Sequence, residues 1–525
     1  MRIKIQWWYW FIIFGYFSTW CYSAMLPEYG GTYRTALPGQ VGTFDPARGY
    51  SPAERWLVMN LYDRLIALNN QNLPIPGLAE SWSISADGLT WTFTLRTTAR
   101  FHTGKPVTAE SVKFSIERLV NPTLRAPKSW LFSSVSGYRE YLSGQATQIT
   151  GIIVTNSRTI QFRLLKPNSN FLYALLSPAA SIVSPEDSAA IDTHPIGSGP
   201  FIFAEATTPF IRLTANPEYW EGRPYLDNIQ FYFSDNPTSD LLEFELGNLD
   251  VCSVPEAEFH RIDEHPQWQS LLIPINTPNI GYLGFNLTKA PMTDLAFRQA
   301  FKYGIDRKGI LEIVLNNHGT LSASLLANLQ PDSEFYAYSL SSAQLMVQRF
   351  PKRMLGLIVN QEEYAAYLIA QRIQSNFLAA GYPIRVEQLP AKEYSQRIRE
   401  GNYDLFYCHY FADNPDPEII LQTLLLEKNF GIEGNQSFYY HPQLETILNA
   451  AKSADDESER TTRLLRVEKI IQQDIPLIPF FQVTPYFIRQ PEVENLDQSA
   501  YRYHELKNVW LNKLMERSTI TKSGN

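Results

Sequence analysis

Residues 76–112, PGLAESWSISADGLTWTFTLRTTARFHTGKPVTAESV, decide how this chain folds, and they begin with a hairpin pattern. Before the turn, Trp82 and Ile84 alternate with serine. After Asp87-Gly88, apolar residues alternate with threonine over 91–95. An Asp-Gly pair between two alternating runs is a strong short-range signal for a β-hairpin.

A helix pattern follows the hairpin. Thr108 precedes an amphipathic segment over 110–119, and Ala109 and Glu110 occupy the first turn. Threonine is a good N-cap and an acidic first turn suits the helix dipole, so a capped helix is predicted there. Beyond it, predicted strands alternate with predicted helices, which argues for an α/β fold with a partly parallel sheet. The predicted strands are 151–154, 159–164, 201–203, 229–233, 276–286, 355–359, 384–388 and 403–409, and the predicted helices are 52–65, 238–246, 295–303, 364–379 and 391–399.

Composition bounds the class of protein. The chain has 525 residues, which is enough for two or three domains. The formal net charge is -8, and no basic stretch occurs, which argues against a nucleic-acid partner. Aromatic residues make up 13% of the chain, which suits thick cores or a pocket lined with flat apolar faces.

The N-terminus has the pattern of an export signal. A short positive start precedes an apolar run over 7–17, and small residues then predict cleavage after Ser23 or, one residue later, after Ala24. The alternative is an uncleaved anchor or a buried helix. A lipid anchor on Cys21 is disfavoured because Trp20 occupies the position where that signal requires a small residue. No second run of eighteen apolar residues follows.

Motifs for catalysis or metal binding are not found. The eight histidines are scattered, without the spacing of a zinc site. His409 adjoins Cys408, but neighbours on a strand point to opposite faces. No GxSxG, Walker or GxGxxG sequence occurs, so we predict no enzyme, no catalytic residue, no metal and no cofactor. Whether Cys252 and Cys408 form a disulfide is left open.

Several segments together resemble the extracytoplasmic solute-binding proteins of ABC importers, the peptide- and nickel-binding family 5. The strongest matches are three runs, 76–82, 87–96 and 101–112, in register with the hairpin and helix. One segment departs from the family pattern, because 319–338 contains a single proline where relatives have a proline-rich passage. Weaker matches are FDPA at 44–47, GSGPF at 197–201, NPEYW at 216–220, LGNLDV at 246–251, FN at 285–286, RQA at 298–300, IDR at 305–307, ADNPDP at 412–417 and DIPLIP at 474–479.

The resemblance implies a hinge-linked, two-lobed periplasmic-binding-protein-like fold, of the class with an extra inserted domain. The hinge strands are then expected near 276–283 and 480–486. The implied domains are a signal peptide at 1–23, lobe I at 24–65 with 180–277 and 486–525, the inserted domain at 66–179, and lobe II at 278–485.

The resemblance also implies a ligand-binding site. Asp413 matches the aspartate that pairs with the ligand's α-ammonium group in peptide-binding relatives. Its neighbours His409, Tyr410 and Phe411 end a predicted strand, where side chains can face a cleft. Ala412, between Phe411 and Asp413, is a further candidate for this site. The alternative for Asp413 is a cap on the helix that begins near Pro417, since Asp-Asn-Pro is also turn chemistry.

Three further regions are candidates for the ligand site. Gly39 and Gln40 lie in a loop that faces ligand in relatives; the alternative is an ordinary connecting loop. Trp130 is a candidate for stacking on the ligand, with buried core as the alternative. Asn435 begins a polar and aromatic segment that can line a pocket, with an exposed loop as the alternative.

The implied function is that of a receptor. It captures a di- or oligopeptide between two lobes in the periplasm and delivers it to the permease subunits of an ABC transporter at the inner membrane. We expect a monomer. The alternatives are a receptor for a non-peptide ligand such as a nickel chelate, or a ligand-sensing module without transport. The export signal argues against the second alternative, since relatives that regulate DNA begin with a helix-turn-helix instead.

Overall fold

A computed structural model describes most of the chain from residue 26 to residue 515. The described ranges are 26–39, 41–49, 51–168, 170–234, 236–275, 279–326, 333–361, 364–410, 416–431, 434–452, 454, 457–482, 484–499, 501–502 and 504–515. The predicted signal at 1–23 lies outside them. No helix within the described ranges is long and apolar enough to cross a membrane.

Lobe I is the part of the molecule built on a seven-stranded sheet, whose strand order is β12-β19-β11-β1-β10-β9-β8. β1 lies inside the sheet and runs parallel to both β10 and β11, as expected for strands connected through helices. Helix α1 packs on one face, where Trp56 meets Phe231 of β10, and α5, α6 and α7 cover the other face. The bounds are β1 Thr32–Pro38, β8 Phe201–Ala206, β9 Phe210–Ala215, β10 Asn228–Ser234, β11 Val251–Ser253, β12 Leu272–Pro274, β19 Tyr486–Arg489, α1 Pro52–Leu61, α5 Pro237–Glu245, α6 Glu256–Asp263 and α7 Pro266–Gln269, with the short pair β20 Val493–Glu494 and β21 Trp510–Leu511 near the C-terminus.

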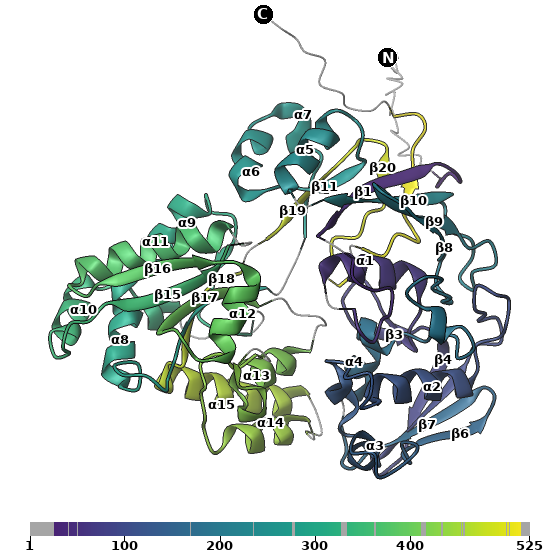
Figure 1. Cartoon of the computed structure of the whole chain (residues 1–525), viewed down its shortest axis with the longest axis horizontal. Coiled ribbons are helices and arrows are strands. Elements are labelled where there is room, and N and C mark those ends of the chain that lie inside the picture. Colours follow the sequence, from purple (N-terminus) through teal and green to yellow (C-terminus); the bar gives the residue numbers. More distant parts are fainter. Residues whose placement is uncertain are drawn as a thin grey trace, which may run out of the picture.

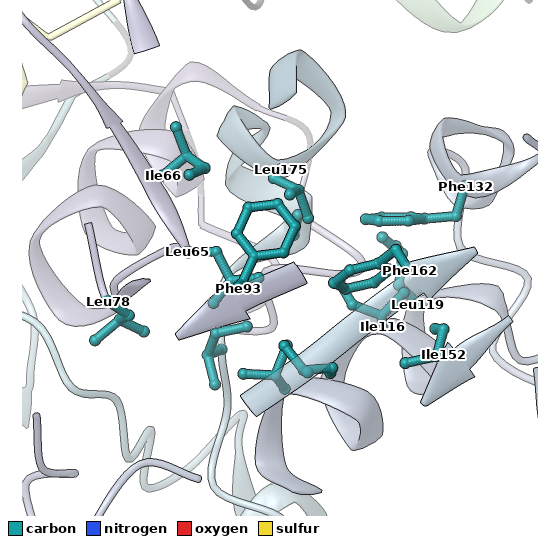
Figure 2. Close-up of a cluster of buried hydrophobic side chains, with 14 of the residues drawn as sticks. Leu65, Ile66, Leu78, Phe93, Ile116, Leu119, Phe132, Ile152, Phe162 and Leu175 are labelled. Carbon is teal, nitrogen blue, oxygen red and sulfur yellow. The ribbon is translucent and has the colours of Figure 1, made fainter. Parts of the chain in front are cut away.

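A second, smaller part is built on the four-stranded antiparallel sheet β4-β5-β7-β6, which we call the small sheet. The predicted hairpin is confirmed as β4 paired with β5. Helix α2 packs against the sheet, and Phe93, Phe162 and Ile116 meet in the core between them (Figure 2). The bounds are β2 Ile66–Leu68, β3 Pro74–Pro76, β4 Ala79–Ile84, β5 Thr90–Leu95, β6 Ile152–Asn156, β7 Thr159–Arg163, α2 Ala109–Val120, α3 Tyr138–Leu142 and α4 Phe171–Leu176.

Lobe II is built on a six-stranded mixed sheet with the order β14-β18-β13-β17-β15-β16. Hydrophobic clusters fill both faces of the sheet, as buried runs such as Leu355–Val359 require. The bounds are β13 Ile280–Phe285, β14 Thr320–Leu321, β15 Leu355–Asn360, β16 Ile384–Leu389, β17 Leu405–Tyr410, β18 Leu477–Gln482, α8 Leu295–Gly304, α9 Arg307–Val314, α10 Leu340–Val347, α11 Tyr364–Ala379, α12 Ala391–Arg399, α13 Pro417–Leu425, α14 Leu444–Lys452 and α15 Glu457–Asp474.

The chain passes between the two large sheets twice, once from β12 to β13 and once from β18 to β19. β12 pairs with β19 in lobe I, β13 pairs with β18 in lobe II, and the Ile275 amide donates to the Pro485 carbonyl at 2.9 Å, so the described ends of the two passages lie side by side. Two adjacent connections form an axis about which two lobes can rotate. The passages are shorter than the predicted hinge ranges, because 280–283 belongs to β13 and 480–482 to β18.

Local patterns explain the helix boundaries. The predicted cap is confirmed, since the Thr108 side chain accepts a hydrogen bond from the Ser111 amide at the start of α2. The helix predicted to extend to Leu65 ends instead at Leu61, because Tyr62 is extended and leads the chain toward β2. Pattern alone missed this end, since Leu65 keeps the helical spacing but belongs to the core beneath the small sheet.

Candidate functional site

A hydrogen bond joins the part that contains the small sheet to lobe II. Asn170 immediately precedes α4, and its side-chain Nδ2 donates to Glu418 Oε1 at 3.0 Å. Glu418 lies in the first turn of α13, the lobe II helix that faces α4 in Figure 1. The contact therefore spans the space between the small-sheet part and lobe II, and it depends on their relative position.

Glu418 belongs to a buried charged cluster at the start of α13. Asp416 caps this helix by accepting from the Glu418 amide at 3.0 Å. Arg460 of α15 donates from Nε to Glu418 Oε1 at 3.0 Å and from Nη2 to Asp416 Oδ1 at 2.8 Å. Among the described residues, Glu418 Oε2 has no hydrogen-bond partner.

Burial dominates the electrostatics of this cluster. It raises the pKa of both the Asp416 and Glu418 carboxyl groups, and the charge of Arg460 opposes that rise. Lys452 adds a second positive charge near both carboxyl groups. Because Asp416 and Glu418 are buried and both pair with Arg460, they form a buried charged network at the start of α13.

Tyrosines gather at the boundary between the lobes. Tyr410 ends β17 in lobe II, and burial raises the pKa of its phenol to about 12. The pKa of Tyr501, in the C-terminal segment of lobe I, is also raised by burial. Tyr410, Tyr173 and Asp416 raise the Tyr501 pKa further and Arg55 lowers it, so groups from both lobes lie near this phenol.

A pocket lies between α1 of lobe I and the part that contains the small sheet. Arg55, in α1, and Lys128, in the loop after α2, both line it and are half-buried. Burial, and then the charge of Arg55, lower the pKa of Lys128 to about 7. The other lining residues are Pro46, Gly49, Ser51, Glu54, Val58, Pro178 and Ala179.

The predicted site residues have different outcomes. Asp413, Phe411, Ala412 and Gln40 lie outside the described residues, so their roles stay predictions. Their neighbour Tyr410 lies at the boundary between the lobes, and its contact with ligand also stays a prediction.

The alternative role for Asp413, a cap on the helix that begins at Pro417, is wrong. Asp416 occupies the N-cap position and its side chain accepts from the Glu418 amide. Asp-Pro at the start of a helix is a common pairing, because proline suits the first helical position. That local signal was sufficient to identify Asp416 as the cap.

Gly39 lies directly after β1, with a φ of +102° and no atom within 4 Å of where a side chain would begin. The backbone conformation, rather than crowding, therefore favours glycine at this position. Its predicted contact with ligand stays a prediction.

For both Asn435 and Trp130, the structure contradicts the alternative to a ligand-binding role. Asn435 is buried rather than in an exposed loop, because its side chain bonds to the backbone of Leu426 and of Tyr439. Trp130 is 43% exposed, so the buried-core alternative is wrong. Exposure leaves its ring accessible, and stacking on a ligand stays a prediction.

Sequence reasoning missed Asn170, Glu418 and Arg460. Glu418 lies one residue beyond the matched family segment 412–417, but nothing local indicates that Asn170 reaches it across 248 positions. Arg460 lies on α15, and it reads as an ordinary solvated charge in the sequence although it is buried.

The segment that departs from the family pattern is anchored to lobe II where it is described. Arg307 Nη1 donates to the carbonyls of Ser322 at 2.5 Å and Pro479 at 2.7 Å. Glu468 accepts from the Leu325 amide at 3.2 Å. These bonds bury 322 and 324–326 against the sheet.

Both Cys252 and Cys408 lie within the described ranges. Cys252 of β11 and Cys408 of β17 are both buried free thiols, in different lobes. No three His, Cys, Asp or Glu side chains are grouped as metal ligands in that part of the chain.

Two sheet-based lobes joined by a paired connection, with polar groups meeting between them, define a two-lobed α/β binding protein. A family model described as bacterial extracellular solute-binding proteins, family 5 Middle, matches residues 74–431, and the chain belongs to this family. The resemblance seen in the sequence is thereby confirmed.

Individual relatives cover most of the chain. It is 27% identical over 475 residues to Heme-binding protein A of Haemophilus influenzae, covering 84% of this chain and 85% of that protein. It is 25% identical over 481 residues to the dipeptide-binding protein of Escherichia coli, covering 86% and 88%. The murein tripeptide binding protein of Escherichia coli superposes with a TM-score of 0.79 at 20% identity, covering 93% of this chain and 100% of that one. This likeness confirms the predicted two-lobed fold.

Proposed function

We propose that this protein is a periplasmic receptor that captures a di- or oligopeptide between its lobes and delivers it to the permease of an ABC transporter. Membership of the solute-binding family supports receptor function, and relatives include a dipeptide-binding protein and a Haemophilus influenzae protein solved in complex with the peptide RPPGFSPFR. The receptor binds its ligand without altering it, and is not an enzyme. The domain boundaries predicted from the sequence form part of this proposal.

The observation that carries the proposal is the paired connection between lobes I and II, together with the contact of Asn170, in the part that contains the small sheet, with Glu418 of lobe II. A rotation about the connection opens and closes the space between the lobes. A ligand that contacts both lobes favours the closed form by its difference in affinity for the two forms. A transporter that recognises the closed form thereby receives loaded receptor.

Asp413 is the proposed partner of the ligand's ammonium group, and Tyr410, Phe411 and Ala412 adjoin it in the proposed site. A partly desolvated carboxylate opposite an ammonium forms a charge-assisted hydrogen bond that is stronger than a surface ion pair. We expect Asp413→Ala to lose about tenfold or more in peptide affinity with an unchanged melting temperature. Equal affinity by calorimetry removes Asp413 from the site. Gly39, Gln40, Trp130 and Asn435 are retained as weaker proposals.

The experiment that tests the function is ligand capture. Residues 24–525, unfolded and refolded to remove bound material, are mixed with a pool of random di- to nonapeptides and examined by native mass spectrometry. We expect one intact peptide per chain. Cleaved peptide contradicts the assignment as a receptor that leaves its ligand unaltered. Failure to bind any peptide, with binding of nickel-histidine or haem offered in parallel, contradicts the peptide assignment.

A further inference from the structure

An aromatic contact joins lobe II directly to lobe I. The His318 ring, in the turn after α9 of lobe II, lies against the Phe259 ring of α6 in lobe I, with ring centroids 3.6 Å apart. Tyr486, the first residue of β19, packs on the same Phe259 ring, and its ring centroid lies 6.0 Å from that of His318. Among the described residues the His318 side chain forms no hydrogen bond or ion pair, so these two aromatic side chains of lobe I hold it in place.

The turn that carries His318 is fixed to lobe II. Asn316 and Asn317 both adopt a left-handed backbone, with φ of +46° and +63°, which asparagine tolerates better than most residues. The Asn317 amide donates to the Leu311 carbonyl of α9 at 3.0 Å, and β14, which follows the turn, pairs with β18. The His318 ring therefore moves with lobe II when the lobes rotate.

The contact lies on the opposite side of the hinge from the Asn170–Glu418 bond. In Figure 1, α6 and α9 lie above β18, whereas α4 and α13 face each other below it. A rotation that separates α4 from α13 therefore moves α9 toward α6. Rings already in contact cannot approach further, so opening has to displace the His318 ring and break its aromatic contacts. The contact thus favours the closed arrangement.

Protonation of His318 opposes this contact. Burial lowers the pKa of its imidazole from an ordinary 6.5, the charge of Asp263 on α6 raises it, and that of His260 on the same helix lowers it. Glu264 lies 3.2 Å from His260, and Tyr486 is the group that faces the imidazole from β19. A group whose pKa is lower in the closed form binds its proton preferentially in the open form. Closure is therefore favoured while His318 is neutral, and that effect is lost as the pH falls.

We propose that His318 and Phe259 form an acid-sensitive latch on the far side of the hinge, which keeps the lobes closed near neutral pH and releases them when the imidazole gains a proton. The inference rests on the proposed function and adds a regulation to it, since peptide is held at neutral pH and released in acid. His318 is a positioning residue, because it acts on the arrangement of the lobes and not on the ligand.

The first test follows the imidazole itself. The His318 signal is identified by NMR through its loss in His318→Phe, and it is titrated with pH in the wild type, with and without a saturating random tripeptide pool. We expect the pool to lower the pKa of His318, because closure holds the ring against Phe259. A pKa that is unchanged or raised by the pool overturns the latch.

The second test measures affinity for the same pool by calorimetry. At pH 8 we expect His318→Ala to bind about twofold to tenfold more weakly than the wild type, as loss of an aromatic pair implies. His318→Phe keeps a ring against Phe259 without a titratable group, so it should retain wild-type affinity at pH 8 and lose less of it at pH 5. The matched control is His194→Phe, at an exposed histidine outside the contact, which should follow the wild type at both pH values.

The outcomes separate the latch from the proposed function. Binding by His318→Ala that equals or exceeds that of the wild type overturns the latch, and so does a loss of affinity in acid that His318→Phe shares in full. Failure of the wild type to bind the pool at any pH refutes the proposed peptide function itself, whereas binding whose pH dependence is independent of His318 refutes only the latch.

Discussion

Removing the hydrogen bond between Asn170 and Glu418 should shift the protein toward its open form. Asn170→Ala deletes the Nδ2 donor that lies 3.0 Å from Glu418 Oε1. A hydrogen bond contributes about 0.5–1.5 kcal/mol between neutral groups and about 1.5–3 kcal/mol when one group is charged. Burial raises the pKa of Glu418 to about 7, and Arg460 still pairs with the same oxygen in the variant, so we expect a loss of about 1.5 kcal/mol, where the two ranges meet. About 1.4 kcal/mol corresponds to a tenfold change in an equilibrium constant.

Calorimetry measures the peptide affinity, which depends on the fraction of protein in the closed form. Where the open form predominates without ligand, apparent affinity scales with the closed fraction, so we expect about tenfold weaker peptide binding by calorimetry. The melting temperature should change little, because Asn170 makes no side-chain cap on α4. The matched control is Asn168→Ala, whose side chain accepts only from the Asn170 amide among its described bonds. Wild-type affinity in Asn170→Ala, or an equal loss in Asn168→Ala, refutes the reasoning.

Two further predictions concern stability. Burial raises the pKa of Glu468 from an ordinary 4.5 to about 7, so the folded protein holds an extra proton between those values and its free energy of unfolding falls as pH rises through that window. Glu468→Gln should remove this contribution, on the order of 3 kcal/mol, and make the fall in melting temperature between pH 5 and 8 shallower. Part of the fall should remain, because burial also raises the pKa of Glu418 to about 7 and that of Asp63 to about 6; an unchanged slope contradicts the prediction. Phe162→Ala should cost about 3–5 kcal/mol in denaturant unfolding, because its buried ring packs on Phe93 and Phe171. Leu165→Ala, at a 57% exposed residue, is the control, and a similar loss there contradicts the core assignment.

The sequence predicted features that short segments determine. The hairpin at β4 and β5 depends on alternation and an Asp-Gly turn, and both are local. Helix α11 matches the predicted Tyr364–Ala379 because its apolar spacing continues until Gly381, which adopts a φ of +93° that favours glycine. These elements follow from neighbours in the chain, so their prediction needs no knowledge of the fold.

The site was less predictable because it depends on partners distant in the sequence. The Asn170–Glu418 contact forms only when the small-sheet part meets lobe II, and the pocket lined by Arg55 and Lys128 forms only when α1 meets the small-sheet part. Asn435 shows a different limit, because its partners lie close in the sequence: its polarity suggested an exposed loop, whereas it is buried and bonds to nearby backbone groups. A polar residue in the sequence does not reveal whether water or backbone satisfies its hydrogen bonds.

The central claim, that the lobes close on a peptide, is tested most directly by small-angle X-ray scattering. Residues 24–525 are measured without ligand and with a saturating amount of a peptide identified by the capture experiment. The account predicts that peptide lowers the radius of gyration in the wild type and that more peptide is needed in Asn170→Ala. Peptide bound at full occupancy with no change in the radius of gyration contradicts capture by closure.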